Sequence, residues 1–126
     1  MADPQAALTH VSGDHLEESD HTPGMLRRKA VQTAGVWSGT AVTEPGAASA
    51  WHHHGAHESI LYLARGSLRM EFGPGGASSF DATAGDFVHV PPWAVHRETN
   101  PGDEASLLVV VRTGSGAPTT NVAGPA

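Results

Sequence analysis

The sequence predicts an all-β fold in which short antiparallel strands form a barrel or sandwich. Glycine and proline are frequent, with 15 and 9 copies in 126 residues, and they divide the chain into runs of strand length. One run alternates clearly, because Leu68, Met70 and Phe72 are separated by Arg69 and Glu71. No segment keeps an apolar stripe of helical period over several turns, so we expect helices to be minor.

The first half of the chain supplies three expected strands with turn signals between them. Residues 26–33 carry a short basic patch, which is typical of a solvated strand face. Residues 36–43 alternate small and apolar side chains. After a Pro-Gly turn, the run at 50–54 is rich in histidine.

The second half continues the same pattern. Residues 59–64 and 68–72 flank a tight Arg-Gly turn, and a glycine-rich hairpin loop leads into residues 80–90. A proline corner precedes the last expected strand, 106–113, which is apolar on both faces. Antiparallel double-sheet barrels, jelly rolls included, leave few free strand edges, and we expect that architecture here.

The two ends of the chain lack hydrophobic periodicity. Residues 1–24 end in a Pro-Gly turn signal, and residues 114–126 are small, polar and proline-bearing. We therefore expect one domain, a barrel over residues 25–113, with extended N- and C-terminal arms.

Composition argues against several functional classes. The formal net charge of −6 offers no basic surface for nucleic acid or for anionic membranes. The chain has no cysteine, which excludes disulfides, zinc-thiolate sites and cysteine nucleophiles. Its start lacks a basic segment followed by an apolar run, and no apolar stretch is long enough to cross a bilayer. We expect a soluble, cytoplasmic protein.

Four of the nine histidines lie within residues 52–57, more than local strand or turn structure requires. If this run is extended, His52 and His54 point to one face and His53 points to the other. His96 follows the proline corner and is aimed back at the barrel from a separate segment. Imidazoles delivered to one point by two separated elements are what a metal site requires. We therefore predict that His52, His54 and His96 bind a metal ion.

The residues around these histidines resemble the two motifs of the cupin family. The first motif has glycine, five residues and His-x-His. The second has glycine, five residues, Pro-x-Gly, two residues, histidine, three residues and asparagine. The matching residues are Gly46, His52 and His54 in the first motif and Gly85, Pro91, His96 and Asn100 in the second, with Trp93 in place of the motif glycine. The resemblance covers residues 35–112 and implies a double-stranded β-helix jelly roll with a metal inside the barrel.

One ligand of the family pattern is missing. The resemblance implies a glutamate ligand at position 59, which is Ser59 in this chain. His57 has the same strand facing as Ser59, whereas Glu58 faces the other way unless a bulge turns it inward. Both are candidates for the remaining ligand. We favour His57, which makes the expected site all-histidine.

An all-histidine site has a chemical consequence. Neutral imidazoles leave the double positive charge of the ion uncompensated, so the ion favours anionic, bidentate oxygen donors such as enolates, β-diketones or phenolates. We expect one divalent transition metal ion, with zinc, iron, manganese, nickel and copper as candidates. Two cupin subgroups resemble this ligand set. One is the dioxygenases that cleave β-diketones with three-histidine iron, and the other is the four-histidine zinc polyketide cyclase of resistomycin biosynthesis.

Two functional hypotheses follow. The first is a metal-dependent cyclase, isomerase or dioxygenase that acts on a small oxygen-rich substrate, with His57, Glu58 and His89 as candidate proton shuttles. The expected cavity walls are Leu61, Leu63, Met70, Phe87 and Trp93. The alternative is a non-catalytic module that binds or senses a small ligand, and open metal positions facing a cavity would favour the enzyme. The resemblance also implies a homodimer, which the apolar outer face of the last strand favours independently.

Overall fold

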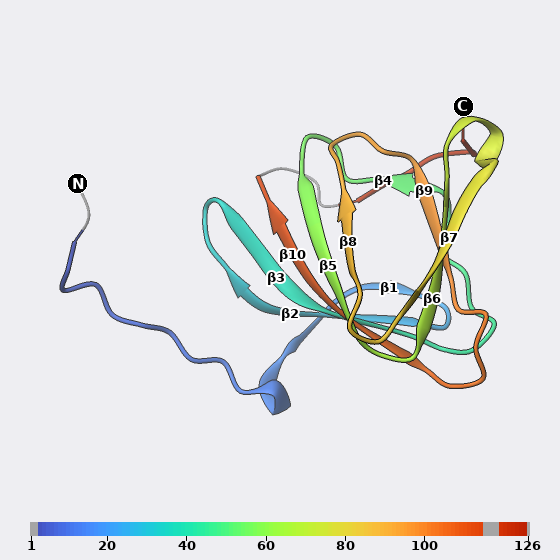
Figure 1. Cartoon of the computed structure of the whole chain (residues 1–126). Helices are drawn as coiled ribbons and strands as arrows, with labels where there is room; N and C mark the ends of the chain where they lie inside the picture. The colour runs from blue at the N-terminus through green and yellow to red at the C-terminus, as the bar shows by residue number, and fades with distance from the viewer. Residues whose placement is uncertain (1–2, 115–118, 126) are drawn as a thin grey trace.

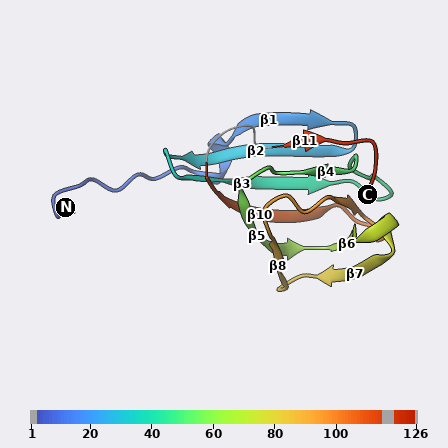
Figure 2. The same ribbon diagram turned by 90° about the horizontal axis from the view of Figure 1, so that it is seen from above.

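The computed structural model describes residues 3–114 and 119–125 and confirms the all-β fold. Within these residues, two antiparallel sheets enclose a common core as a jelly-roll barrel (Figures 1 and 2). The strands are β1 (Glu17–Thr22), β2 (Met25–Gln32), β3 (Val36–Thr43), β4 (His52–His53), β5 (Glu58–Arg65), β6 (Ser67–Phe72), β7 (Ser78–Thr83), β8 (Phe87–Val90), β9 (His96–Thr99), β10 (Ser106–Thr113) and β11 (Thr120–Asn121). Two short 3-10 helices accompany them, η1 (Gly13–His15) and η2 (Pro74–Gly76). No helix of the described residues is long and apolar enough to cross a membrane.

Strands from distant parts of the sequence lie side by side in both sheets. The six-stranded sheet has the order β1-β2-β3-β10-β5-β8, and the five-stranded sheet has the order β11-β4-β9-β6-β7. β10 lies between β3 and β5 and pairs with both along its whole length. In the other sheet, β4 pairs with β9 through His52 and His96. The jelly-roll topology therefore makes neighbours of the two histidine motifs.

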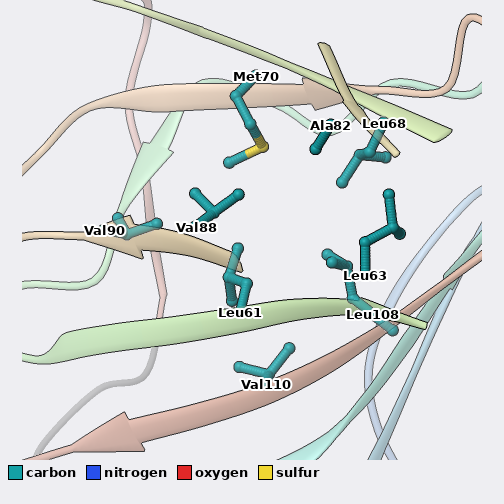
Figure 3. Packing of buried hydrophobic residues seen from close by; sticks show 10 residues of the cluster. Leu61, Leu63, Leu68, Met70, Ala82, Val88, Val90, Leu108 and Val110 are labelled. Atoms are coloured by element: carbon teal, nitrogen blue, oxygen red, sulfur yellow. The ribbon is translucent and has the colours of Figure 1, made fainter. Parts of the chain in front are cut away.

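The hydrophobic core lies between the sheets and is built by alternate residues of their inner faces (Figure 3). In β5, for example, Leu61 and Leu63 are buried while Ile60 and Tyr62 are exposed. Each fully buried side chain of this size contributes about 1.5–3 kcal/mol relative to an exposed one. The buried core residues are Ala41, Leu61, Leu63, Leu68, Met70, Ala82, Val88, Val90, Leu108 and Val110.

Both terminal arms contribute strands that the sequence analysis did not predict. β1 extends the six-stranded sheet by pairing with β2, so the sheet begins at Glu17 and the expected barrel boundary falls in the β1–β2 turn. β11 pairs with β4 beside the histidines. Both are edge strands of mostly polar residues. Main-chain hydrogen bonds hold them in place, so their side chains show no hydrophobic alternation from which they could be predicted. Residues 3–12, before η1, extend away from the barrel (Figure 1).

The loops that carry the two motifs are tied to each other. Trp93 has a φ of 64°, the only positive φ of a non-glycine residue in the described chain, at the position where the family pattern has glycine. Its N–H donates to the carbonyl oxygen of Gly55 at 2.8 Å. Asn100, the last residue of the second motif, is buried and donates from Nδ2 to the carbonyl oxygens of Thr43 (2.9 Å) and Glu104 (2.8 Å). The bond of Trp93 ties the loop before β9 to the turn after β4, and the bonds of Asn100 hold the end of β9 against the end of β3 and the loop that follows β9.

The outer face of the six-stranded sheet carries a continuous apolar surface. It consists of Ile60, Tyr62, Phe87, Val109 and Val111, which are exposed and lie opposite one another on β5, β8 and β10. The expectation that Phe87 and Trp93 line the cavity is wrong, because their exposed fractions are 72% and 64%. The alternation of β8 turns Val88 and Val90 inward and Phe87 outward.

Candidate metal centre

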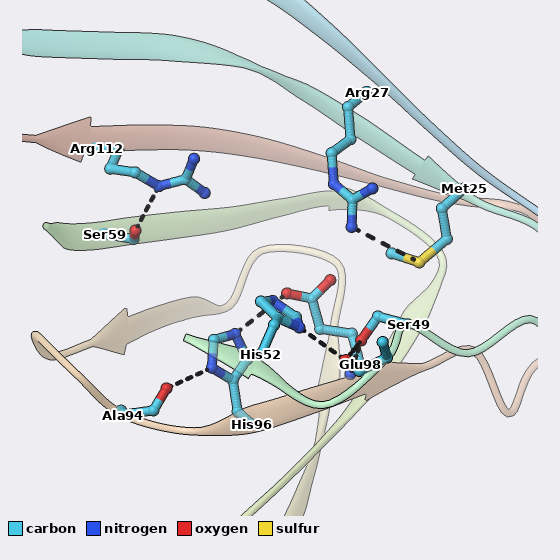
Figure 4. A network of polar contacts seen from close by, with 10 residues as sticks. Met25, Arg27, Ser49, His52, Ser59, Ala94, His96, Glu98 and Arg112 are labelled. Carbon is cyan, nitrogen blue, oxygen red and sulfur yellow. Dashed lines mark hydrogen bonds and ion pairs between the residues drawn. The ribbon is translucent and has the colours of Figure 1, made fainter. Parts of the chain in front are cut away.

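Three histidines from two strand segments converge inside the barrel, and Figure 4 shows two of them, His52 and His96. His52 lies in β4, His54 follows two residues later with the same facing, and His96 begins β9. All three are buried, with exposed fractions of 2 to 6%. One ring nitrogen of each lies within 4.8 Å of the others, and the ring centroids of His52 and His96 are 4.3 Å apart. The residues for which the sequence predicted a metal site are therefore brought together.

Hydrogen bonds fix the orientation of two of these rings. Nδ1 of His52 donates to the carbonyl oxygen of Ala50 at 2.8 Å, and Nδ1 of His96 donates to that of Ala94 at 2.9 Å. Each bond leaves Nε2 as the nitrogen with the free lone pair, which is how metal-binding imidazoles are usually held. Burial lowers the pKa of His52, which favours the neutral, metal-binding form.

Nε2 of His96 lacks a partner of its own. The atom is buried and accepts no hydrogen bond from the described residues. A buried polar atom without a partner costs free energy in a finished structure, so its presence needs an explanation. A cation among the three rings would satisfy it, and the nitrogen donor set fits a divalent transition metal.

Glu98 lies beside the histidines and was missed by the sequence analysis. It follows His96 by two residues in β9, so both side chains face the barrel interior, and its exposed fraction is only 8%. Its Oε1 lies 3.6 Å from Nε2 of His96 (Figure 4). Burial raises the pKa of Glu98, but its interactions with His96, His52 and Arg27 outweigh this effect and lower the pKa to about 2. The strand alternation that relates His52 to His54 was the signal that could have found Glu98.

A cavity of about 40 Å³ opens beside these side chains. Its wall includes two arginines, Arg27 from β2 and Arg112 from β10, together with Glu98, His52 and His54. A single water needs about 10–15 Å³ of such space, so the cavity accepts a group of only a few atoms without rearrangement. The cavity is thus small, and its wall combines apolar side chains such as Leu61 and Leu108 with polar groups that include two arginines.

Ser59 occupies the place of the glutamate ligand in the family pattern. It is fully buried, as its strand facing predicts, and its Oγ accepts a hydrogen bond from Nε of Arg112 at 3.1 Å (Figure 4). The guanidinium carbon of Arg112 lies 5.4 Å from the ring centroid of Trp37. The family pattern places a carboxylate ligand at this position. In this chain the position is Ser59, and the guanidinium group of Arg112 lies against it.

His57 is buried, but the structure does not bring it into the group formed by the other three histidines. Its Nδ1 donates to the carbonyl oxygen of Thr113 at 2.9 Å, and its Nε2 has no hydrogen-bond partner among the described residues. It lines a second cavity, which it shares with Trp37 and Arg112.

Glu58 and His89, the other candidate proton shuttles, lie on the outer face of the six-stranded sheet. Oε2 of Glu58 is 3.3 Å from Nε2 of His89, and both side chains are about half exposed. Strand alternation places Glu58 outside and Ser59 inside, without a bulge that would turn Glu58 inward. The structure therefore does not bring either side chain to the three histidines.

A double-sheet jelly roll with converging histidines inside defines a candidate metal-binding barrel. Residues 39–112 match the family described as Cupin domain, and the chain belongs to this family, as its two motifs predicted. No curated protein matches the sequence of the chain.

Solved structures with a similar fold include KdgF, a polyketide cyclase and an oxalate decarboxylase. KdgF from Halomonas sp. is 17% identical with a TM-score of 0.72, and the match covers 86% of this chain and 96% of that one. The polyketide cyclase RemF from Streptomyces resistomycificus is 17% identical with a TM-score of 0.77, covering 92% and 86%. Oxalate decarboxylase from Bacillus subtilis, described with Mn(II) centres, is 24% identical with a TM-score of 0.72, covering 84% and 30%. At these identities the likeness shows the fold alone.

Proposed function

We propose that this cupin is a metal-dependent enzyme that acts on a small, anionic, oxygen-rich substrate. The observation that carries the proposal is the buried group of His52, His54 and His96 beside a cavity lined by two arginines. A bound divalent ion would supply Lewis acidity, which polarises a coordinated oxygen and stabilises the negative charge that develops on it. Zinc, iron, manganese, nickel and copper all suit a site of this kind, and manganese occurs in the structurally similar oxalate decarboxylase.

The cavity wall supports an anionic substrate. Arg27 donates from Nη1 to Oγ1 of Thr22 at 3.0 Å, and Arg112 donates from Nε to Ser59, so both guanidinium groups are oriented by neighbours. Oriented guanidinium groups bind planar oxygen anions well because their N–H groups match the oxygen positions. Enolates, β-diketonates and phenolates meet this requirement, and cyclisation, isomerisation or oxygen-dependent cleavage are the reactions that these substrates undergo.

Proton transfer during such a reaction needs a group near the substrate. His57 is the best placed of the three candidates, because its unpartnered Nε2 is buried and it shares a cavity wall with Arg112. Glu58 and His89 would need a substrate on the outer face of the sheet. We therefore retain His57 as the candidate shuttle.

The test is a turnover screen of metal-loaded protein. Small β-diketones and phenols are offered first, because the cavity of about 40 Å³ holds only a few atoms without rearrangement, and phenolic polyketides follow. Each is offered with and without oxygen, and product and oxygen consumption are measured. The proposal expects turnover by wild-type protein and none by His52→Ala. Saturable ligand binding with no turnover by any metal form would instead identify a non-catalytic binding or sensing protein.

We further propose that two copies of the chain pair through the apolar outer surface of Ile60, Tyr62, Phe87, Val109 and Val111. Five exposed apolar side chains on three adjacent strands form a patch of the kind that usually marks a protein interface. A second copy presents the same apolar patch, and a two-fold pairing would cover both patches at once, with Glu58 and His89 beside them.

A further inference from the structure

We propose that Glu98 is a carboxylate ligand of the metal and replaces the glutamate that the family pattern places at position 59. The proposal rests on the proposed metal-dependent function and specifies its ligand set. It changes the expected site from all-histidine to three histidines and one carboxylate, with the carboxylate supplied by β9 instead of β5.

The position on β5 cannot supply this ligand. Ser59 has no carboxylate, and its hydroxyl is engaged by Arg112. Glu58 is the adjacent acidic residue, but it points to the outer face and contacts His89. Among the acidic residues of the described chain, Glu98 alone is both buried and on the cavity wall.

The carboxylate of Glu98 lies within reach of an ion held by His96. At 3.6 Å, Oε1 and Nε2 are too far apart for a good hydrogen bond. Two ligand atoms that each lie about 2.1 Å from a tetrahedral ion are about 3.4 Å from each other. The separation is thus close to that of a ligand pair, so only a rotation of the Glu98 side chain is needed to bring an oxygen to an ion on Nε2 of His96, which has no hydrogen-bond partner among the described residues.

The backbone of Glu98 is fixed, while its side chain has room to adjust. Ser49 Oγ accepts from the N–H of Glu98 at 3.0 Å, and the Ser49 N–H donates to the Glu98 carbonyl oxygen at 2.8 Å. The group of atoms within 4.8 Å of one another includes no oxygen of Glu98, so ligation needs a rotation of the carboxylate about its side-chain bonds. The cavity that Glu98 lines leaves space for that rotation.

Charge balance favours the same assignment. A buried carboxylate is costly unless a cation or several donors compensate it. Ligation would pair the Glu98 charge directly with the ion and leave a net charge of +1 at the metal. Such a centre is a weaker Lewis acid than an all-imidazole one. Arg27 and Arg112 then become the groups that retain an anionic substrate.

The test compares Glu98→Gln with Glu58→Gln, which neutralises an exposed carboxylate on the outer face of the other sheet. Zinc affinity is measured by competition with a chromophoric chelator, and the Co(II)-loaded proteins are compared by visible absorption. We expect Glu98→Gln to weaken zinc binding by about 100-fold or more, since even loss of an outer partner of a ligand costs about 10–100-fold. Its Co(II) bands should shift, and Glu58→Gln should match wild type in both measurements.

Wild-type affinity and an unchanged Co(II) spectrum in Glu98→Gln would overturn the assignment while leaving the three-histidine site intact. If wild-type protein binds no metal, the proposed function itself fails, which is a separate result. Glu98→Asp keeps the charge but shortens the side chain, so it covers the case in which Glu98→Gln does not fold. This variant should also bind zinc more weakly, and unchanged affinity would again contradict the proposal.

Discussion

Metal binding at the three histidines should stabilise the fold, and removal of one ring should abolish that effect. The perturbation is His52→Ala, with His53→Ala as its matched control. His52 is buried in the group, whereas His53 faces away, with its ring centroid 5.4 Å from that of Trp93. The two changes remove the same side chain from adjacent positions of β4.

The size of the expected effect follows from linkage between binding and folding. A ligand at one hundred times its Kd stabilises the folded state by about 2.7 kcal/mol. For a chain of 126 residues, an unfolding entropy of about 2.1 cal/mol/K per residue converts this into a rise in Tm of about 10 °C. A 100-fold loss of affinity in His52→Ala reduces the stabilisation at the same metal concentration to about 0.4 kcal/mol, or less than about 2 °C.

The assay is thermal unfolding with and without zinc after chelator treatment, for the wild type and both variants. Differences between the metal-free proteins do not matter, because the measured quantity is the shift that metal produces in each one. His53→Ala should keep the full shift. The reasoning is refuted if metal shifts all three proteins equally, or if His53→Ala loses the shift and His52→Ala retains it.

Three further outcomes are expected. Asp81→Asn should lower the Tm at pH 7 and should have no effect well below pH 3.8. The hydrogen bond from Arg69 holds the pKa of Asp81 below its ordinary value of 3.8 in the folded protein. The stabilisation from the ionised Asp81 is therefore fully present above pH 3.8 and is lost as the pH falls through the lowered pKa. Leu63→Ala should cost about 2–5 kcal/mol of unfolding free energy in urea titrations, because the side chain is fully buried in the core. Phe87→Glu should convert a dimer to a monomer by light scattering at micromolar concentration, and a wild-type monomer would contradict the proposed pairing.

Much of the barrel could be predicted because its signals are local. The alternation in β6 and the glycine and proline turns depend on near neighbours, and the spacing of His52, His54 and His96 follows from strand facing. β1 and β11 were missed because main-chain pairing at a sheet edge leaves little mark on side-chain hydropathy. Phe87 was misplaced because an apolar residue on an outer face looks like a core residue in sequence.

The composition of the site depends on contacts that local patterns do not contain. The sequence analysis looked for the fourth ligand near β5, where the family pattern has it, although strand facing alone already placed Glu98 on the side of His96. The position of Arg112 against Ser59 depends on the pairing of β10 with β5, residues that are far apart in the chain. The arginine lining of the cavity could therefore be seen only in the folded structure.

The most direct test of the account is a crystal of the protein grown with zinc or manganese and measured at the absorption edge of that metal. We expect one anomalous peak per chain inside the barrel, about 2.0–2.3 Å from one ring nitrogen each of His52, His54 and His96. An oxygen of Glu98 at a similar distance would support its assignment as a ligand. A fully loaded crystal with no peak among the three histidines, or with its metal elsewhere, would contradict the account.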